Sequence, residues 1–176
     1  MQVKAAPSPT TGQEPEPVVY LLVGLTGSGK TTYAKRRLGP AGAVRLSVDE
    51  LVFERHGRYG VDYPERQYFE LEAPVVAEVR ERLAELVAAG RDVVLDHGLW
   101  LRSDREEWKK LVQSAGRWRL LYFPVERAEL LRRLDERNRR EDANALAVTQ
   151  SALDDFHARF EPPQDEAEEI IEPGSF

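Results

Sequence analysis

A glycine-rich stretch near the start of the chain has the residue types and spacing that bind nucleotide phosphates. Residues 24–31 read GLTGSGKT and match the pattern G-x-x-x-x-G-K-[ST] in full. The glycines let the backbone wrap closely, so that its N–H groups point at phosphate oxygens. We therefore expect a nucleotide to be held by the segment that comprises Gly24, Leu25, Thr26, Gly27, Ser28, Gly29, Lys30, Thr31 and Thr32.

Three residues at the end of this stretch have separate expected tasks. Lys30 is expected to reach the β- and γ-phosphates, and the Thr31 hydroxyl to bind Mg²⁺. Thr32 is placed to contact the α-phosphate. The predicted cofactors are therefore ATP and Mg²⁺.

The elements around the loop predict a layered α/β fold. Four short apolar runs, at 18–23, 43–47, 92–96 and 118–123, are hydrophobic on both faces, as strands of a helix-covered parallel sheet are. Helical patterns cover about 65–89, 103–114, 125–137 and 149–160, and one more runs from the loop to about 38. The sequence thus predicts a three-layer P-loop sandwich with a mainly parallel sheet of about five strands.

Details of these elements can also be predicted. Pro74 should kink or divide the long helix, and Ser103 with Glu106 resembles a capping box. The segment 168–173 can supply a short last strand. We expect a single domain over 18–172, preceded by a disordered arm over 1–17 that is rich in proline and threonine.

Two aspartates stand at the ends of predicted strands. Asp49 follows the second apolar run and Asp96 ends the third. Ligands of open parallel sheets gather beyond the carboxyl ends of the strands, so both carboxylates should face the nucleotide. They could orient an acceptor hydroxyl or hold Mg²⁺. Alternatively, Asp49 caps the following helix and Asp96 is a turn residue.

Composition narrows the functional classes. The net charge is −6, which disfavours a nucleic-acid substrate unless a local basic groove exists. Cysteine is absent and only three histidines occur, so thiolate sites, disulfides and histidine-rich metal sites are not expected. No apolar stretch approaches the roughly 20 residues of a membrane span, and the first residues lack the apolar core of a secretory signal. We expect a cytoplasmic protein with no membrane partner.

Several motifs together resemble a family of small kinases. The loop, LSVDEL (46–51), VVLDHGLW (93–100) followed by RSDREEW (102–108), and FEPP (160–163) look like the zeta-toxin/polynucleotide-kinase-like group, often catalogued as an AAA-type P-loop kinase domain. The resemblance spans about 18–163. It implies an ATP-dependent phosphotransferase with an alcohol group as acceptor, in a subgroup of unknown substrate.

The resemblance also implies roles for individual residues. Asp49 matches the general base, and Arg105 matches an arginine that holds the acceptor or its phosphate. A lid arginine that closes on ATP falls on Arg137, with Arg139 or Arg140 as neighbours. Polynucleotide kinases commonly carry an arginine soon after the catalytic aspartate, whereas the first one here is Arg55.

The remaining candidates have two interpretations each. The segment RRLDERNRR (132–140) is either a lid over the triphosphate or a solvated helix face with pairs such as Glu129–Arg133. His97 and Trp100 could line the acceptor pocket, or Trp100 could cap the core. Asp96 could support either the metal or the acceptor.

The expected function is transfer of the γ-phosphoryl group of ATP to a hydroxyl of a small molecule, namely a nucleoside, a sugar or an antibiotic. A polynucleotide 5′-hydroxyl kinase is one alternative, although the net charge makes it less favoured. A non-catalytic ATP-binding regulatory module is another. The sequence lacks the Asn-Lys-x-Asp motif that reads guanine, which argues against a GTPase.

Overall fold

The computed structural model of the chain describes residues 14–137, 139, 149–174 and 176. Its centre is a parallel sheet with the strand order β2-β3-β1-β4-β5. The strands are β1 (Val18–Val23), β2 (Val44–Ser47), β3 (Val93–Asp96), β4 (Arg117–Tyr122) and β5 (Glu168–Ile170). The predicted fold class is confirmed, including the short last strand.

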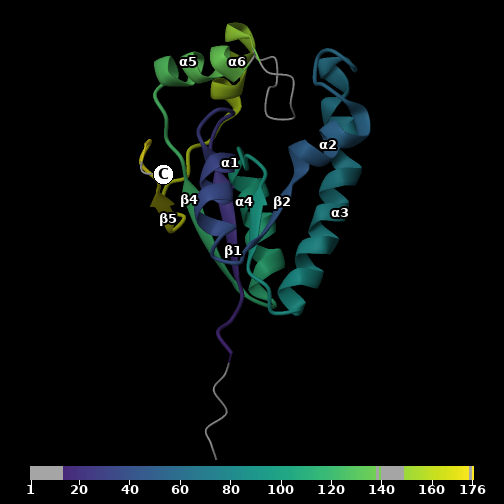
Figure 1. The fold of residues 1–176 in the computed structure, drawn as a ribbon, viewed down its shortest axis with the longest axis vertical. Helices are drawn as coiled ribbons and strands as arrows, with labels where there is room; N and C mark the ends of the chain where they lie inside the picture. Colours follow the sequence, from purple (N-terminus) through teal and green to yellow (C-terminus); the bar gives the residue numbers. More distant parts are fainter. Residues whose placement is uncertain (1–13, 138, 140–148, 175) are drawn as a thin grey trace, which may run out of the picture.

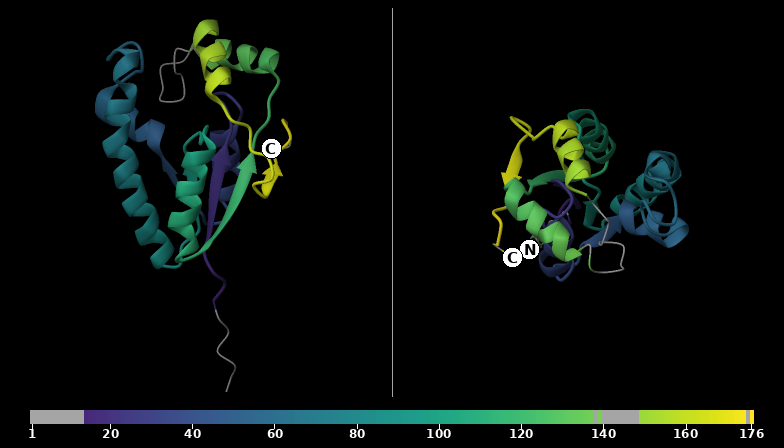
Figure 2. Two further views of the ribbon diagram at one scale, coloured as in Figure 1. Left: turned by 180° about the vertical axis from the view of Figure 1, so that it is seen from behind. Right: turned by 90° about the horizontal axis from the view of Figure 1, so that it is seen from above.

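Helices cover the sheet and one of its ends (Figure 1). They are α1 (Lys30–Tyr33), which continues into the π-helical turn η1 (Ala34–Leu38), α2 (Val48–His56), the 3₁₀ turn η2 (Glu65–Gln67), α3 (Tyr68–Ala88), α4 (Arg102–Gln113), α5 (Arg127–Arg137) and α6 (Gln150–Arg159). Figure 2 shows α5 and α6 lying together at one end of the sheet, while α2 and the start of α3 stand apart from them.

Three apolar clusters explain this arrangement. The largest joins one face of the sheet to α2, α3 and α4, with Leu21, Val79 and Trp108 among its buried members. The opposite face packs on α1 and η1 through Leu38. The third cluster buries Leu25 of the phosphate loop under α5 and α6. The phosphate loop is therefore held in place by apolar packing against α5 and α6 as well as by its connection to the sheet.

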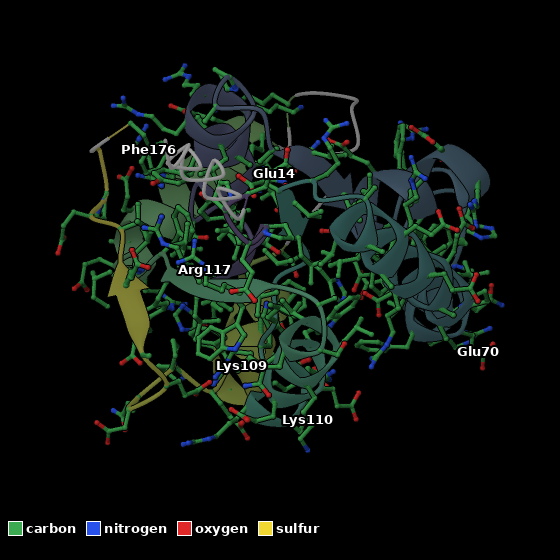
Figure 3. All side chains as sticks on the ribbon, turned by 90° about the horizontal axis from the view of Figure 1, so that it is seen from below. Glu14, Glu70, Lys109, Lys110, Arg117 and Phe176 are labelled. Carbon is green, nitrogen blue, oxygen red and sulfur yellow. The ribbon has the colours of Figure 1, made fainter. Side chains whose placement is uncertain are left out.

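The side-chain periodicity of α4 separates a buried and an exposed lysine. Seen from below, Lys109 lies toward the body of the molecule and the neighbouring Lys110 lies farther out (Figure 3). Lys109 is 5% exposed, and its ammonium nitrogen lies 4.7 Å from the centre of the Trp118 ring. Arg105, one turn earlier on the same face, is also buried. This helix therefore carries positive charge into the interior.

The structure excludes a division of the long helix at Pro74, and the predicted cap at Ser103 was wrong. Pro74 does not divide α3, which is one helix, because Pro74 is exposed and water can replace the hydrogen bond it removes. Ser103 does not cap α4, which begins at Arg102 after Leu101 without a side-chain cap. None of the helices in the described part of the chain combines the length and apolar content that a membrane span requires.

Candidate active site

The phosphate loop has a backbone that only glycine tolerates at several points. A Cβ atom at Gly24 would lie 2.6 Å from Ser28 Oγ and 3.1 Å from the Phe123 carbonyl oxygen. Gly27 and Gly29 have φ angles of 86° and 101°, in the left-handed region that disfavours other residues. The loop thus folds tightly at the head of α1, as a phosphate-binding loop requires.

Lys30 reaches back over the loop that precedes it. Its ammonium donates hydrogen bonds to the carbonyl oxygens of Gly24 (2.8 Å) and Leu25 (3.0 Å) and to Ser28 Oγ (3.4 Å). Burial lowers the pKa of Lys30 to about 8, although Asp96 and Asp49 act in the opposite direction. An anionic ligand at this position would hold the ammonium in its charged form.

Asp96 links the loop to the neighbouring strand. Its Oδ2 accepts hydrogen bonds from Thr31 Oγ1 at 2.7 Å and from Arg45 Nε at 3.0 Å. Arg45 also pairs with both oxygens of Glu50, at 2.9 and 2.8 Å. The Thr31 hydroxyl and the Asp96 carboxylate are therefore adjacent oxygen donors, the ligand type that Mg²⁺ prefers. Among the described residues, there is no group of three or more Asp, Glu, His or Cys side chains that could hold a metal ion.

Asp49 lies in the first turn of α2, and its carboxylate is held by α3. Ser47, not Asp49, caps α2 by accepting a hydrogen bond from the backbone of Glu50 at 3.3 Å. The Tyr68 hydroxyl donates to Asp49 Oδ1 at 2.5 Å. Burial, followed by the nearby Asp49 charge, raises the pKa of Tyr68 far above its usual value, so this hydroxyl remains a donor. The Asp49 carboxylate is therefore oriented by a permanent hydrogen bond.

Glu72 lies one turn after Tyr68 and extends the same group. Its Oε1 is 3.7 Å from His97 Nδ1. Burial and then the Asp49 charge raise the pKa of Glu72 to about 7. Burial also lowers the pKa of His97, despite the carboxylates around it. Strongly shifted groups such as Glu72, gathered beside a phosphate loop, are typical of a functional site.

One cavity of about 1330 Å³ joins the loop to this acidic group. The loop and α5 line one side of this cavity, α2 and α3 line the other, and α6, which packs on α5, also contributes to the lining. Its lining contains most of the residues predicted for the site, namely Thr26, Gly27, Gly29, Lys30, Thr31, Thr32, Asp49, Asp96, His97, Trp100 and Arg137. Leu25 and Ser28 are buried within the loop instead, and the backbone N–H of Gly24 donates to the Gly98 carbonyl at 3.2 Å.

Trp100 combines both roles considered for it. It lines the cavity, and its ring packs on Phe156 of α6 with the ring centres 4.9 Å apart.

The lid arginines divide between the cavity and the surface. Arg137 lines the cavity, and so does Arg133, whose guanidinium donates to the Gly27 carbonyl oxygen at 3.2 Å. Arg133 also pairs with Glu129 at 2.7 Å, as expected from their spacing. Arg139 pairs with Asp135 on the exposed side. Arg140 lies outside the described residues.

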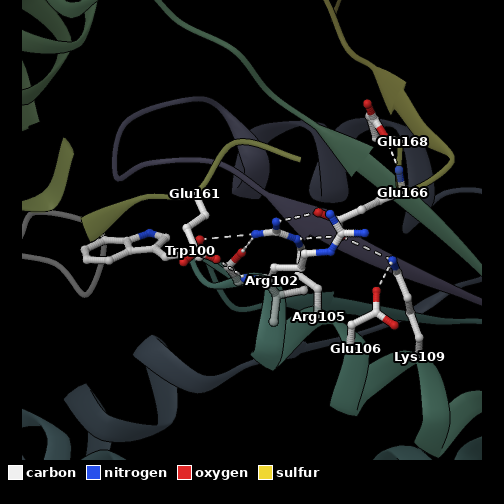
Figure 4. A network of polar contacts seen from close by, with 9 residues as sticks. Trp100, Arg102, Arg105, Glu106, Lys109, Glu161, Glu166 and Glu168 are labelled. Atoms are coloured by element: carbon white, nitrogen blue, oxygen red, sulfur yellow. Dashed lines mark hydrogen bonds and ion pairs between the residues drawn. The ribbon is translucent and has the colours of Figure 1, made fainter. Parts of the chain in front are cut away.

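Arg105 is the predicted site residue that the structure does not bring to the cavity. It is 1% exposed and pairs with Glu166 through two hydrogen bonds, at 2.9 and 2.6 Å (Figure 4). Its remaining donors bind the carbonyl oxygens of Leu99 (2.9 Å) and Trp100 (3.1 Å). All three guanidinium nitrogens therefore donate to groups inside the protein, and Arg105 has a structural role in place of the expected contact with an acceptor.

Comparison with known proteins agrees with this geometry. The sequence profile of the family described as "AAA domain" matches residues 19–163. The chain belongs to the AAA domain family. This membership confirms the resemblance drawn from the sequence motifs. A search of curated proteins found no match.

Solved structures similar to this AAA domain include several kinases. A gluconokinase from Sinorhizobium meliloti 1021 is 19% identical, with a TM-score of 0.62 over 92% of this chain and 85% of that one. A putative kinase from Chloroflexus aurantiacus is 14% identical, with a TM-score of 0.71 over 89% and 88%. The APS kinase of Mycobacterium tuberculosis, in complex with AMPPNP and APS, is 19% identical, with a TM-score of 0.60 over 92% and 91%. At these identities the likeness shows the shared fold.

Three residues of this AAA domain site, Arg45, Tyr68 and Glu72, were not found from the sequence. Arg45 is a charged residue inside an otherwise mainly apolar strand, a pattern that indicates a carboxylate partner nearby. Tyr68 and Glu72 are four residues apart, so they share one face of a helix. Arg133 was considered within the lid segment 132–140 and as a partner of Glu129, but its contact with Gly27 was not predicted, because it joins positions 106 residues apart.

Proposed function

We propose that this AAA domain transfers the γ-phosphoryl group of ATP to a hydroxyl group of a small molecule. The observation that carries the proposal is the position of Asp49. Its carboxylate, fixed by Tyr68, opens into the same cavity as the phosphate loop. A carboxylate opposite a phosphate loop is the arrangement that proton removal from an acceptor hydroxyl needs.

In this proposal the donor is held from two sides. Backbone N–H groups of the loop and the Lys30 ammonium bind the triphosphate from below. Arg133 and Arg137 approach from α5 and neutralise negative charge during transfer. Thr31 and Asp96 would hold Mg²⁺, which would neutralise part of the negative charge of the β- and γ-phosphates.

The acceptor side follows from the same geometry. The acceptor oxygen attacks the γ-phosphorus, its proton passes to the Asp49 carboxylate, and the bond to the leaving oxygen of ADP breaks. Tyr68 holds Asp49 in position by its hydrogen bond and does not itself take the proton, since its pKa lies far above the usual range. The kinases among the similar structures support this class of reaction, and their own acceptors differ from one another, so they do not identify the acceptor of this chain.

The test is transfer of label from γ-labelled ATP to a panel of nucleosides, sugars, antibiotics and a 5′-hydroxyl oligonucleotide. Asp49→Asn should lower transfer by about 10²- to 10⁴-fold while ATP binding stays nearly unchanged. Asp135→Asn, an exposed change on α5, is the matched control and should behave like the parent. Normal transfer by Asp49→Asn would show that Asp49 is not the base.

Other outcomes identify the alternative functions. Labelling of the oligonucleotide in preference to every small molecule would establish a polynucleotide 5′-kinase. ATP binding with no labelled product from any hydroxyl compound would establish a non-catalytic nucleotide-binding module. Either result would overturn the proposal.

A further inference from the structure

The two ends of the cavity differ in charge. The end at the phosphate loop is lined by four cationic side chains, Lys30, Lys35, Arg133 and Arg137, and by two acidic ones, Asp96 and Glu136. The opposite end is formed by the start of α2, the segment before α3, α3 itself, residues 97–104 and α6. There, five carboxylates stand against two guanidinium groups, namely Asp49, Glu65, Glu72, Asp104 and Asp155 against Arg66 and Arg159.

Glu72 is a largely enclosed carboxylate at this end, with Asp49 and Asp104 among its neighbours. Its side chain is 15% exposed. The charges of Asp49 and Asp104 both raise its pKa, in addition to burial. Of the two guanidinium groups at this end, that of Arg159 is paired with Asp155 at 2.7 Å. A positive group placed beside Glu72 would therefore be attracted, whereas an anion would meet three carboxylates.

The walls of this end carry a second, independent feature. Aromatic rings from four different segments line it, namely Tyr59, Phe69, Trp100 and Phe156. Phe69 is 61% exposed, and Leu101, which also lines the cavity, is 39% exposed. Large apolar side chains left open at the edge of a cavity are typical of a surface that packs on a ligand. Aromatic faces also attract cations.

We propose that Glu72 is a specificity-determining residue of this site and that the acceptor it selects is a hydroxylated amine. This inference rests on the proposed phosphotransfer. The ammonium group of the acceptor binds Glu72, its carbon skeleton packs on Trp100 and Phe69, and its hydroxyl faces Asp49. Acceptors with a carboxylate or phosphate group are disfavoured by the same carboxylates.

The test compares acceptors that share one skeleton and differ in charge: glucosamine, glucose and gluconate. Binding of each to the full chain with ADP present is followed by tryptophan fluorescence, and phosphorylation is followed with γ-labelled ATP. We expect glucosamine to bind at least about tenfold more tightly than glucose, the scale of one hydrogen bond to a charged group. Gluconate should bind most weakly.

A variant pair isolates Glu72. Glu72→Gln should bring the ratio of glucosamine to glucose affinity close to one. Glu70→Gln is the control, because Glu70 lies on the same helix and points away from the body of the molecule (Figure 3). Its ratio should equal that of the parent.

The outcomes separate the inference from the function on which it rests. Equal affinities, tighter binding of gluconate, or no binding of glucosamine would overturn the inference, and so would an unchanged ratio in Glu72→Gln. Preferential binding of glucosamine without any labelled product would support the inference and overturn phosphotransfer. Efficient labelling of glucose or gluconate over glucosamine would support phosphotransfer and overturn the inference.

Discussion

The buried ion network around Arg105 makes a sharp prediction about stability. Arg105→Met removes both hydrogen bonds to Glu166 and the donors to the Leu99 and Trp100 carbonyl oxygens. Glu166, whose side chain is 1% exposed, would then keep only Lys109, at 3.2 Å. Removing one partner of a buried ion pair costs about 3–5 kcal/mol, because the other charge is left without compensation. For a chain of this size this corresponds to a fall in Tm of roughly 6–20 °C.

The chain offers a matched control on its surface. Arg119 pairs with Glu169 through the same two-bond geometry, at 2.7 and 2.6 Å, but the two side chains are 48% and 43% exposed. Arg119→Met should therefore cost less than about 1 kcal/mol. The two arginine–carboxylate contacts are alike in number and length of bonds, so the comparison sets a buried pair, with its two additional carbonyl contacts, against an exposed one.

The assay is urea denaturation followed by tryptophan fluorescence, with ATP binding measured on the folded variants. We expect Arg105→Met and Glu166→Gln to lose stability and to bind ATP like the parent below their unfolding transitions. The reasoning is refuted if Arg105→Met is as stable as Arg119→Met. Full stability combined with loss of acceptor binding would restore the role at the acceptor that the family resemblance implied for Arg105.

Three further predictions follow from the site. Because burial sets the pKa of Lys30 at about 8, ATP should bind about tenfold more weakly at pH 9 than at pH 7, and a flat affinity would contradict this. Because the pKa of Glu72 is raised from 4.5 to about 7, its ionisation destabilises the fold as pH rises through this window. In urea denaturation at pH 8, the free energy of unfolding of Glu72→Gln should therefore exceed that of the parent by up to about 3 kcal/mol. Near pH 4.5 the two free energies should be equal. Gly24→Ala should abolish ATP binding, since its Cβ would meet Ser28 Oγ at 2.6 Å, whereas Gly39→Ala has room at 3.5 Å and should bind normally.

The donor end of the site could be predicted because its residues are contiguous. The loop, Lys30 and Thr31 lie within one short segment, so their spacing alone fixes their geometry. Asp49 and Asp96 could be placed as well, because the carboxyl ends of parallel strands meet at one edge of a sheet. The structure brings both to the cavity.

The environment of Arg105 could not be predicted from the spacing of residues in the sequence. Its place on the helix after the third strand matched a family position, but its side-chain partner is 61 residues away in the chain. Glu166 precedes the last strand, which pairs with β4 and so brings this segment under α4. Only the three-dimensional path of the chain decides whether an arginine meets a ligand or an internal carboxylate.

The acceptor end of the site could not be predicted for the same reason, because only the fold brings its residues together. Its residues come from α2, α3, the segment 97–104 and α6, and none of these segments positions the others locally. The Arg105 network fixes the carbonyl groups of Leu99 and Trp100, and Trp100 in turn packs on α6. The buried ion pair thus acts on the acceptor wall through the backbone, without lining the cavity. It follows that substitutions on α3 or α6 can alter the acceptor while the phosphate loop is unchanged, whereas loss of Arg105 disturbs the wall by disturbing the fold.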